Sequence, residues 1–193
     1  MVKPNATSRL TSKLYPRCCA RTSNGHSLSA IVLVGPMGVG KTTIGKKLAK
    51  SLGLPFIDTD QVFVADHGPI SDFFEQQGEE KFRELEESIV TEVLTKDAVV
   101  ATGGGSVLSD HIRAELSIAF VVYLATDGRH ISSRLSGGGR PLLQNGLADW
   151  RRIYESRKSL YEEVADLQVD TSNLPLAGII EKIREGLAKD ERF

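Results

Sequence analysis

The sequence predicts an α/β fold, a three-layer domain in which a five-stranded parallel sheet carries helices on both faces. Two observations predict it. Five short apolar segments alternate with helical stretches, and such alternation is typical of a parallel sheet. The first apolar segment, residues 31–34, leads into a glycine-rich turn and then a helix, in which Ile44, Leu48 and Leu52 recur at helical spacing.

The glycine-rich turn has the spacing of a phosphate-binding loop, Gly-x-x-x-x-Gly-Lys-Thr, between residues 35 and 42. Glycines let backbone N–H groups converge on phosphate oxygens at a helix N-terminus, where the helix dipole favours negative charge. Lys41 adds a positive charge for the β- and γ-phosphates, and Thr42 offers a hydroxyl to Mg²⁺. A turn that binds nothing is the alternative, but four fixed positions and both flanks argue against it. The predicted ATP-binding residues of this turn are Gly38, Val39, Gly40, Lys41, Thr42 and Thr43.

The composition indicates one globular domain. The chain has 193 residues and a formal net charge of −1, so no bulk attraction to nucleic acid or to an anionic membrane is expected. No apolar run approaches the roughly 20 residues that span a bilayer. Cys18 and Cys19 are adjacent, which gives neither a disulfide framework nor a metal-site spacing and suits a reducing compartment. We therefore expect a cytoplasmic protein.

Residues 1–29 differ from the rest of the chain, because they are basic, rich in Ser and Thr, and lack Asp and Glu. They contain no apolar segment of the kind found in secretory signals. An organellar transit peptide, which would direct the protein to a plastid, shares this composition. A disordered extension outside the fold is the interpretation we favour. The single domain is expected over residues 30–189.

The remaining elements follow from periodicity and from breaker residues. Gly53 is expected just after the first helix, and Gly68-Pro69 interrupts a mixed stretch over 61–78. Further strands are expected over 54–57, 98–101, 118–124 and 167–170. Further helices are expected over 70–76, 79–94, 127–135 and 149–164, and from Pro175 with Ala177, Ile179, Ile180, Ile183 and Leu187 as its buried side.

Candidate ligand-binding residues follow the second and the third of these strands. Asp58 and Asp60 end the second, and their spacing points both carboxylates to one side if the strand continues. Ligands of open α/β sheets bind beyond the carboxyl ends of strands, so both lie where phosphates would be. The triplet 103–105 follows the third strand; it is either a flexible loop or, as we favour, a place where a ligand approaches the backbone closely.

Two further features concern side chains that could move or pair. Arg83 and Glu86 are three residues apart on a predicted helix, so they are neighbours, and Glu86 can hold Arg83 in a fixed pose. Residues 136–147 are rich in glycine and contain Arg140. This stretch fits a mobile lid and a plain surface loop equally well.

From about residue 30 to 188 the chain resembles the shikimate kinases. Six separated segments carry the resemblance, in the order in which the family has them. They are Gly35–Thr43, Asp58–Asp60, Phe82–Glu86, Gly103–Gly105, Arg140–Leu143, and Arg157 with Tyr161. The resemblance implies a nucleoside monophosphate kinase-like fold with strand order 2-3-1-4-5, a substrate-binding region at about 60–90, and a monomer. It also implies transfer of the γ-phosphoryl group of ATP to the 3-hydroxyl of shikimate, in the biosynthesis of chorismate and the aromatic amino acids.

The resemblance assigns roles to single residues. Thr42 would ligate Mg²⁺ directly and Asp58 through water, while Asp60 would bind the substrate hydroxyls, including the acceptor. Arg83 and Arg157 would clamp the substrate carboxylate, which arginine pairs with bidentately. The implied catalytic residues are Lys41, Asp60 and Arg140. The implied substrate-binding residues are Asp60, Arg83, Gly103, Gly104, Gly105 and Arg157, with Phe74 and Phe82 as pocket walls.

The chain departs from the family in two places at the nucleotide end. Arg134, the expected adenine contact, is separated from Arg140 by five residues, where some members have six. The expected adenine loop, residues 171–175, carries no basic residue. Arg140 would stabilise charge on the β- and γ-phosphates in the transition state.

Three other functions compete with this one. Another small-molecule kinase of the same fold, such as a gluconate or nucleoside monophosphate kinase, gives no reason for Arg83, Arg157 and the glycine triplet to coexist. A regulatory nucleotide switch would need an Asn-Lys-x-Asp motif, which is missing, and a non-catalytic homologue should have lost Lys41, Asp60 or Arg140. A nucleic-acid-binding module would rest on the basic N-terminal stretch alone, without an aromatic platform.

Overall fold

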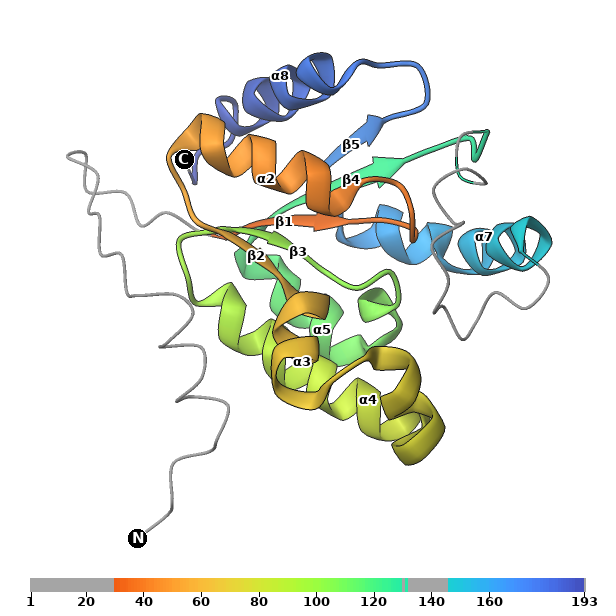
Figure 1. The fold of residues 1–193 in the computed structure, drawn as a ribbon. Helices are drawn as coiled ribbons and strands as arrows, with labels where there is room; N and C mark the ends of the chain where they lie inside the picture. The colour runs from red at the N-terminus through yellow and green to blue at the C-terminus, as the bar shows by residue number, and fades with distance from the viewer. Residues whose placement is uncertain (1–29, 130, 132–145, 193) are drawn as a thin grey trace, which may run out of the picture.

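The computed structural model describes residues 30–129, 131 and 146–192. A five-stranded parallel sheet forms its centre, in the order β2-β3-β1-β4-β5 (Figure 1). The strands are β1 (Ile31–Val34), β2 (Phe56–Asp58), β3 (Val99–Ala101), β4 (Phe120–Ala125) and β5 (Leu167–Asp170). All residues of β1, β3 and β4 are buried, as expected for strands covered on both faces. The predicted fold class and strand order are confirmed.

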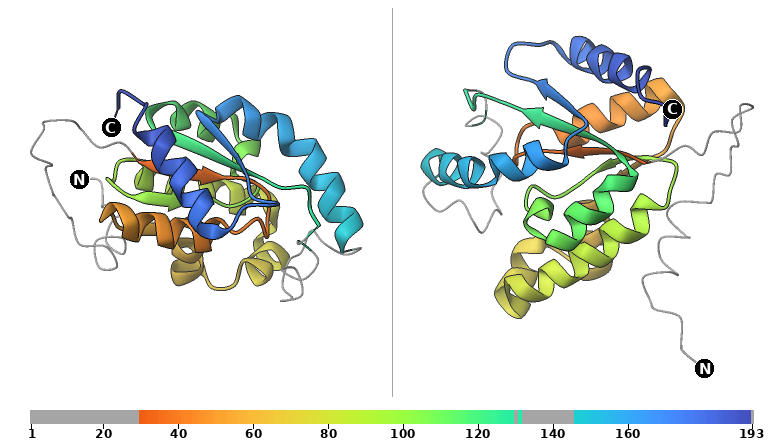
Figure 2. Two further views of the ribbon diagram at one scale, coloured as in Figure 1. Left: turned by 90° about the horizontal axis from the view of Figure 1, so that it is seen from above. Right: turned by 180° about the vertical axis from the view of Figure 1, so that it is seen from behind.

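Helices cover both faces of the sheet. They are α2 (Lys41–Leu52), α3 (Thr59–His67), α4 (Ile70–Leu94), α5 (Asp110–Glu115), α7 (Leu147–Val164) and α8 (Leu176–Leu187), with short 3₁₀ helices η1 (Ser106–Leu108) and η2 (Leu116–Ile118). Helices α2 and α8 lie on one face, whereas α4 and α5 lie on the other (Figure 2). None of the described helices is long and apolar enough to cross a membrane.

Each face has its own apolar core because successive residues of a strand point to opposite sides. Ile31 and Leu33 of β1 pack with α2 and α8, whereas Val32 and Val34 pack with α3, α4, α5 and α7. Strand β1 is the central strand, and it pairs in parallel with β3 on one side and with β4 on the other. This places the ends of β1, β2 and β3 side by side, with the loops that follow them at one edge of the sheet.

The segment after β2 differs from the prediction. The strand does not continue through Asp60, because Asp58 is the N-cap of α3 and helix begins at Thr59. The prediction of a mixed stretch over 61–78 is therefore wrong for residues 61–67, which belong to α3 and show little amphipathic periodicity. A signal was present, since Asp58 followed by Gln61 resembles the N-cap and N3 pair of a capping box.

Helix α4 confirms the two helices expected over 70–76 and 79–94 and shows how they join. They form one element that is interrupted at Gly78, where φ is 82° and ψ is 169°. Residues with a side chain rarely adopt that conformation, so glycine is required for the bend. Gly53, with φ of 70°, follows α2 as predicted.

Several boundaries shift by one to two residues. Strand β4 begins at Phe120 and not at residue 118, and Ile118 is 57% exposed. Helix α7 begins at Leu147 rather than at residue 149. On α8, Ile179, Ile183 and Leu187 are buried as expected, but Ala177 is exposed because it lies on the outer side of the helix.

Some predictions fall outside the described residues. They are the extension over 1–29, most of the helix expected over 127–135, nearly all of the lid expected over 136–147, and both Arg134 and Arg140.

Candidate active site

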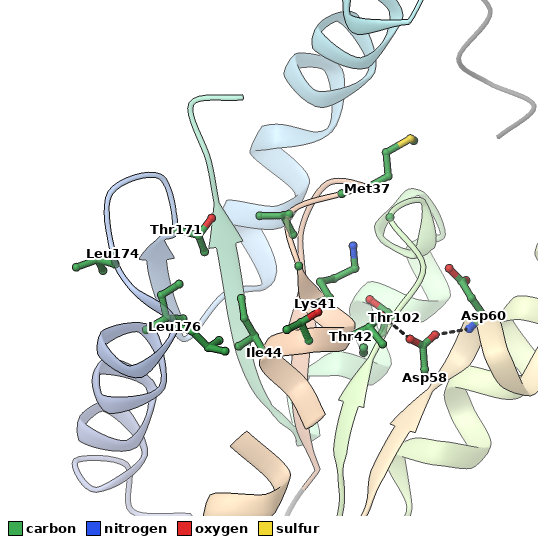
Figure 3. A pocket seen from close by; sticks show the side chains of 17 residues that line it. Met37, Lys41, Thr42, Ile44, Asp58, Asp60, Thr102, Thr171, Leu174 and Leu176 are labelled. Carbon is green, nitrogen blue, oxygen red and sulfur yellow. Dashed lines mark hydrogen bonds between the residues drawn. The ribbon is translucent and has the colours of Figure 1, made fainter. Parts of the chain in front are cut away.

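A pocket of about 580 Å³ opens at the carboxyl ends of β1, β2 and β3. The phosphate-binding loop, residues 35–42, runs through its middle. Asp58 and Asp60 lie on one side of Lys41 and Thr42, and Thr171, Leu174 and Leu176 lie on the other (Figure 3). We call the first side the acceptor end and the second the nucleotide end.

The phosphate-binding loop owes its shape to three glycines. Gly35 has φ of 140°, Gly38 has φ of 80° and Gly40 has φ of 107°, all in the region that side chains avoid. Gly40 is the N-cap of α2, so the helix begins at Lys41 as predicted. The Lys41 ammonium donates to the carbonyl oxygens of Gly35 at 2.7 Å and Pro36 at 3.0 Å. The lysine therefore lies along the loop where phosphate oxygens would bind.

Thr42 and Asp58 join the loop to β2. The Thr42 hydroxyl donates to Asp58 Oδ2 at 2.7 Å, and Asp58 Oδ1 accepts from the backbone N–H groups of Asp60 and Gln61. Within the described ranges, no group of three or more His, Cys, Asp or Glu side chains could hold a metal. One hydroxyl and one carboxylate nonetheless fit Mg²⁺, which keeps several waters and takes most other ligands from phosphates.

Asp60 is the most perturbed carboxyl group of the site. Burial, together with the nearby charges of Asp58 and Glu86, raises its pKa to about 6, although Lys41 and Arg83 act in the opposite direction. A carboxylate with that pKa is ionised at neutral pH and is close to the range that suits proton transfer.

The glycine triplet after β3 packs against the charged side chains of the site. A Cβ at Gly103 would lie 2.5 Å from Glu86 Oε1 and 3.0 Å from Asp60 Oδ1. A Cβ at Gly105 would lie 2.5 Å from the Arg83 guanidinium. None of the three has a positive φ. The structure thus gives Gly103 and Gly105 a reason that sequence reasoning missed, because the protein's own charged side chains occupy the space that a Cβ would need.

Arg83 belongs to a network of ion pairs on α4. Its guanidinium donates to Glu86 at 2.6 Å and to Glu79 at 3.0 Å. Burial lowers the pKa of Arg83, but both glutamates raise it, and the net direction is upward. Glu86 is buried, and its other oxygen accepts from Ser106 Oγ at 2.7 Å. The predicted Arg83–Glu86 pair is confirmed, and burial makes it more rigid than a surface pair.

Arg157 is buried without such a partner. It is 7% exposed, and its guanidinium donates to the carbonyl oxygen of Gly104 at 3.0 Å. No carboxylate of the described residues forms an ion pair with it. A buried cation is costly unless an anion compensates it. Since Arg83 contacts Gly105 and Arg157 contacts Gly104, both guanidinium groups converge on the same stretch of backbone.

Three supporting residues were not predicted for the site. Glu79 adds a second carboxylate to Arg83, and Ser106 orients Glu86. The Tyr161 hydroxyl donates to the Gly104 carbonyl at 2.5 Å, and burial raises its pKa to about 12, so it stays protonated. The sequence contained a signal for two of them. Tyr161 lies one helical turn after Arg157, and Ser106 directly follows the glycine triplet. The predicted wall residues Phe74 and Phe82 contact each other, with ring centroids 4.7 Å apart.

Fold and site together define a class of protein. A phosphate-binding loop, a hydroxyl and carboxylate suited to Mg²⁺, and a half-buried carboxylate near Arg83 are features of a P-loop phosphotransferase. The sequence profile of the shikimate kinases matches residues 37–188. A shikimate kinase of Thiobacillus denitrificans is 41% identical over 158 residues, which are 77% of this chain and 85% of that protein. The chain belongs to the shikimate kinase family, and it is a kinase.

Two solved structures allow the shikimate kinases to be compared with the gluconate kinases, an alternative family of the same fold. A shikimate kinase from Acinetobacter baumannii in complex with shikimate superposes with a TM-score of 0.81 at 35% identity, covering 86% of this chain and 96% of that one. A gluconokinase from Sinorhizobium meliloti gives a TM-score of 0.60 at 25% identity, covering 84% and 93%. Both similarity measures therefore favour the shikimate kinases.

Proposed function

We propose that this kinase transfers the γ-phosphoryl group of ATP to the 3-hydroxyl of shikimate, within the biosynthesis of chorismate and aromatic amino acids. The observation that carries the choice of acceptor is Arg157, a buried guanidinium that no described carboxylate neutralises. An acceptor with a carboxylate would supply that charge, and arginine binds carboxylates through two parallel hydrogen bonds. A polyol without a carboxylate would leave Arg157 uncompensated.

The acceptor would lie along the glycine triplet. Its carboxylate would bind Arg157 and Arg83, which Glu86 holds in place, and its hydroxyls would reach Asp60 beside Gly103. The backbone of Gly103, Gly104 and Gly105 would form the floor of this subsite. Asp60 would orient the acceptor hydroxyl and take its proton, a role that contributes about 10²–10⁴-fold in rate.

The phosphates of ATP would bind the phosphate-binding loop. Backbone N–H groups of Gly38 to Thr43 would face the phosphate oxygens, and Lys41 would leave its two loop carbonyls to contact the β- and γ-phosphates. Thr42 would ligate Mg²⁺ and Asp58 would hold one of its waters. When bound, Mg²⁺ would neutralise charge that develops on the phosphates.

The roles of Arg134 and Arg140 and the monomeric state rest on the family resemblance, and the location and partners rest on the composition of the chain. Arg134 would contact the adenine and Arg140 the β- and γ-phosphates, and both lie outside the described residues. The working form would be a cytoplasmic monomer that needs neither nucleic acid nor membrane. Size-exclusion chromatography with light scattering, expected to give about one chain mass of 21.0 kDa, tests the oligomeric part.

The reaction is tested by ADP release with ATP and Mg²⁺ and four parallel acceptors: shikimate, gluconate, AMP and none. We expect turnover with shikimate alone. Lys41→Met, which removes the charge that acts on the phosphates but keeps a side chain of similar length, should abolish this turnover and leave the thermal unfolding midpoint almost unchanged. Turnover with gluconate or AMP in place of shikimate would contradict the proposed acceptor.

A further inference from the structure

Trp150 lies behind the phosphate-binding loop and is not among the residues that line the pocket. It is buried on α7, and its indole N–H donates to the carbonyl oxygen of Met37 at 2.9 Å. The two residues are 113 positions apart in the chain, so only the tertiary fold brings them together. Trp150 is the single tryptophan of the sequence.

Packing fixes the position of this indole. The ring of Tyr154, one turn further along α7, lies 5.1 Å away between centroids. A Cβ at Gly128 would come within 2.8 Å of an indole carbon, so that glycine leaves room for the ring. Tyr154 shares a hydrogen bond of 2.6 Å with Tyr123 of β4. The indole N–H is therefore a donor with a fixed direction.

The carbonyl that it holds belongs to the central peptide of a β-turn. The Val39 N–H donates to the Pro36 carbonyl at 3.4 Å, which closes a turn over residues 36–39. Gly38, the third residue of this turn, has φ of 80°, whereas Met37 does not have a positive φ. This combination fits a type II turn. Type I and type II turns differ chiefly by rotation of the central peptide, here the one between Met37 and Gly38.

Holding that carbonyl also sets the Gly38 N–H. The peptide is planar and trans, so its C=O and N–H point in opposite directions. The carbonyl points toward α7, and the Gly38 N–H consequently points away from α7, while Gly38 itself lines the pocket. A rotated peptide would present a carbonyl oxygen there, which repels phosphate.

We propose that Trp150 is a positioning residue for ATP: its indole N–H holds the Met37–Gly38 peptide in the orientation that offers the Gly38 N–H to the phosphates. This inference rests on the proposed function in taking Gly38 as an ATP contact. Lys41 differs from Trp150, because it holds the carbonyls of Gly35 and Pro36 but would leave them when phosphates bind. The indole can keep its hydrogen bond in both states.

Trp150→Phe tests this role, because phenylalanine keeps a smaller aromatic ring in the cluster and has no N–H donor. We expect KM for ATP and the dissociation constant of MgADP, measured by calorimetry, to rise about 3- to 10-fold, the size of one net hydrogen bond. KM for shikimate should stay within about 2-fold. Tyr154→Phe is the matched control: it removes a buried hydrogen bond from the same cluster without touching Met37, so it should lower the unfolding temperature and leave both KM values unchanged.

Two outcomes would overturn the inference. One is an unchanged MgADP affinity in Trp150→Phe, and the other is an equal rise of the ATP constants in Tyr154→Phe, which would indicate general packing of α7. Because MgADP binding needs no acceptor, these measurements stand even if wild-type protein fails to phosphorylate shikimate, which would refute the proposed function alone.

A measurement on the wild-type chain covers the case in which Trp150→Phe does not fold. The indole N–H gives a single resonance, since the chain has one tryptophan. We expect its exchange with solvent to be slow without nucleotide and to stay slow with MgADP. Fast exchange in the MgADP complex would show that the hydrogen bond is broken when nucleotide is bound, and would contradict a positioning role.

Discussion

The two ends of the pocket recognise their ligands by different physical means. At the acceptor end, charged side chains gather around three glycines: Glu86 and Arg157 are buried, and Asp60 and Arg83 are half-buried. At the nucleotide end, the loop backbone and apolar side chains such as Leu174 and Leu176 form the lining. Buried charges are costly unless matched, so we expect the acceptor end to discriminate strongly between ligands. We expect the nucleotide end to spread its binding over many small contacts.

The two arginines of the acceptor end also differ from each other, because only one of them has carboxylate partners. Arg83 is neutralised by Glu86 and Glu79 in the absence of any ligand, whereas Arg157 forms an ion pair with none of the described carboxylates and donates to the Gly104 carbonyl. We therefore expect Arg83 to contribute to folding as well as to binding. Arg157 is held in the fold by its neighbours at an electrostatic cost that an anionic ligand would remove.

Asp60→Asn should give the largest effect on the kinetics, and it should affect the acceptor end while leaving the nucleotide end almost unchanged. We expect kcat to fall about 10²–10⁴-fold, because asparagine cannot accept the proton, while KM for ATP changes little. In wild-type protein, kcat/KM for shikimate should decrease as pH falls below about 6, the pKa of Asp60. Initial rates from pH 5 to 8 measure both quantities. A kcat within 10-fold of wild type would exclude Asp60 as a base.

The same substitution should raise stability in a pH-dependent way. The folded-state pKa of about 6 lies above the value of roughly 3.9 for an unfolded aspartate. Folded wild-type protein therefore binds a proton more tightly than the unfolded chain, and its stability falls as pH rises from about 4 to 6. The Asp60→Asn variant does not lose stability in this way. Its unfolding temperature should therefore exceed that of the wild type only slightly near pH 4, and by the largest amount above pH 6. Calorimetry across that range checks the sign.

Arg157→Ala and Arg83→Ala should both raise KM for shikimate by about 10- to 100-fold and leave KM for ATP near its wild-type value. They should differ in stability. Arg83→Ala leaves Glu86 buried without its cation, so its unfolding temperature should drop clearly. Arg157→Ala removes a cation that has no carboxylate, so its unfolding temperature should change less. Equal losses of affinity for shikimate and ATP would instead indicate that these arginines are structural.

Gly105→Ala should raise KM for shikimate about 10-fold, because its Cβ would displace the Arg83 guanidinium. Gly53→Ala is the control: it also adds one methyl group, but nothing lies within 4 Å of the new atom and the site is not near the pocket lining. That control should lose about 1 kcal/mol of stability, since φ is positive there, with both KM values unchanged. If Gly105→Ala and Gly53→Ala had similar KM values for shikimate, the prediction that a side chain at residue 105 disturbs Arg83 would be wrong.

Leu174→Ala should give the smallest effect, at the nucleotide end. Loss of part of one apolar contact should raise KM for ATP by roughly 3- to 5-fold and leave KM for shikimate unchanged. Steady-state kinetics with each substrate varied in turn measures this. A larger rise, comparable to that of Arg157→Ala for shikimate, would mean that the nucleotide end also concentrates its binding in single side chains.

The sequence predicted most of the fold because its local signals agree with the tertiary arrangement. The strand, turn and helix around Lys41 and the end of α2 at Gly53 lie where the pattern put them. Helix α3 was missed, since its residues show little apolar periodicity and its start depends on Asp58 accepting two backbone N–H groups. Secondary-structure propensity could not show whether the strand continues past Asp58 or whether Asp58 caps a helix.

For the site, the residue types and order were readable from the sequence, but their pairing was not. Spacing along one helix was enough to predict the Arg83–Glu86 pair, because neighbours three residues apart must meet. It could not show that Glu86 also bonds Ser106, or that Arg157 lacks a carboxylate, since those relations join separate elements.

By itself, the sequence determined the class of fold, the phosphate-binding loop and the identity of the charged residues after each strand. Those features depend on backbone geometry and side-chain chemistry, which are local. Only the tertiary structure decided the raised pKa of Asp60, the crowding of the glycine triplet and the contact of Trp150 with Met37. Burial, close approach and hydrogen-bond direction are properties of packed elements, and no local pattern along the chain contains them.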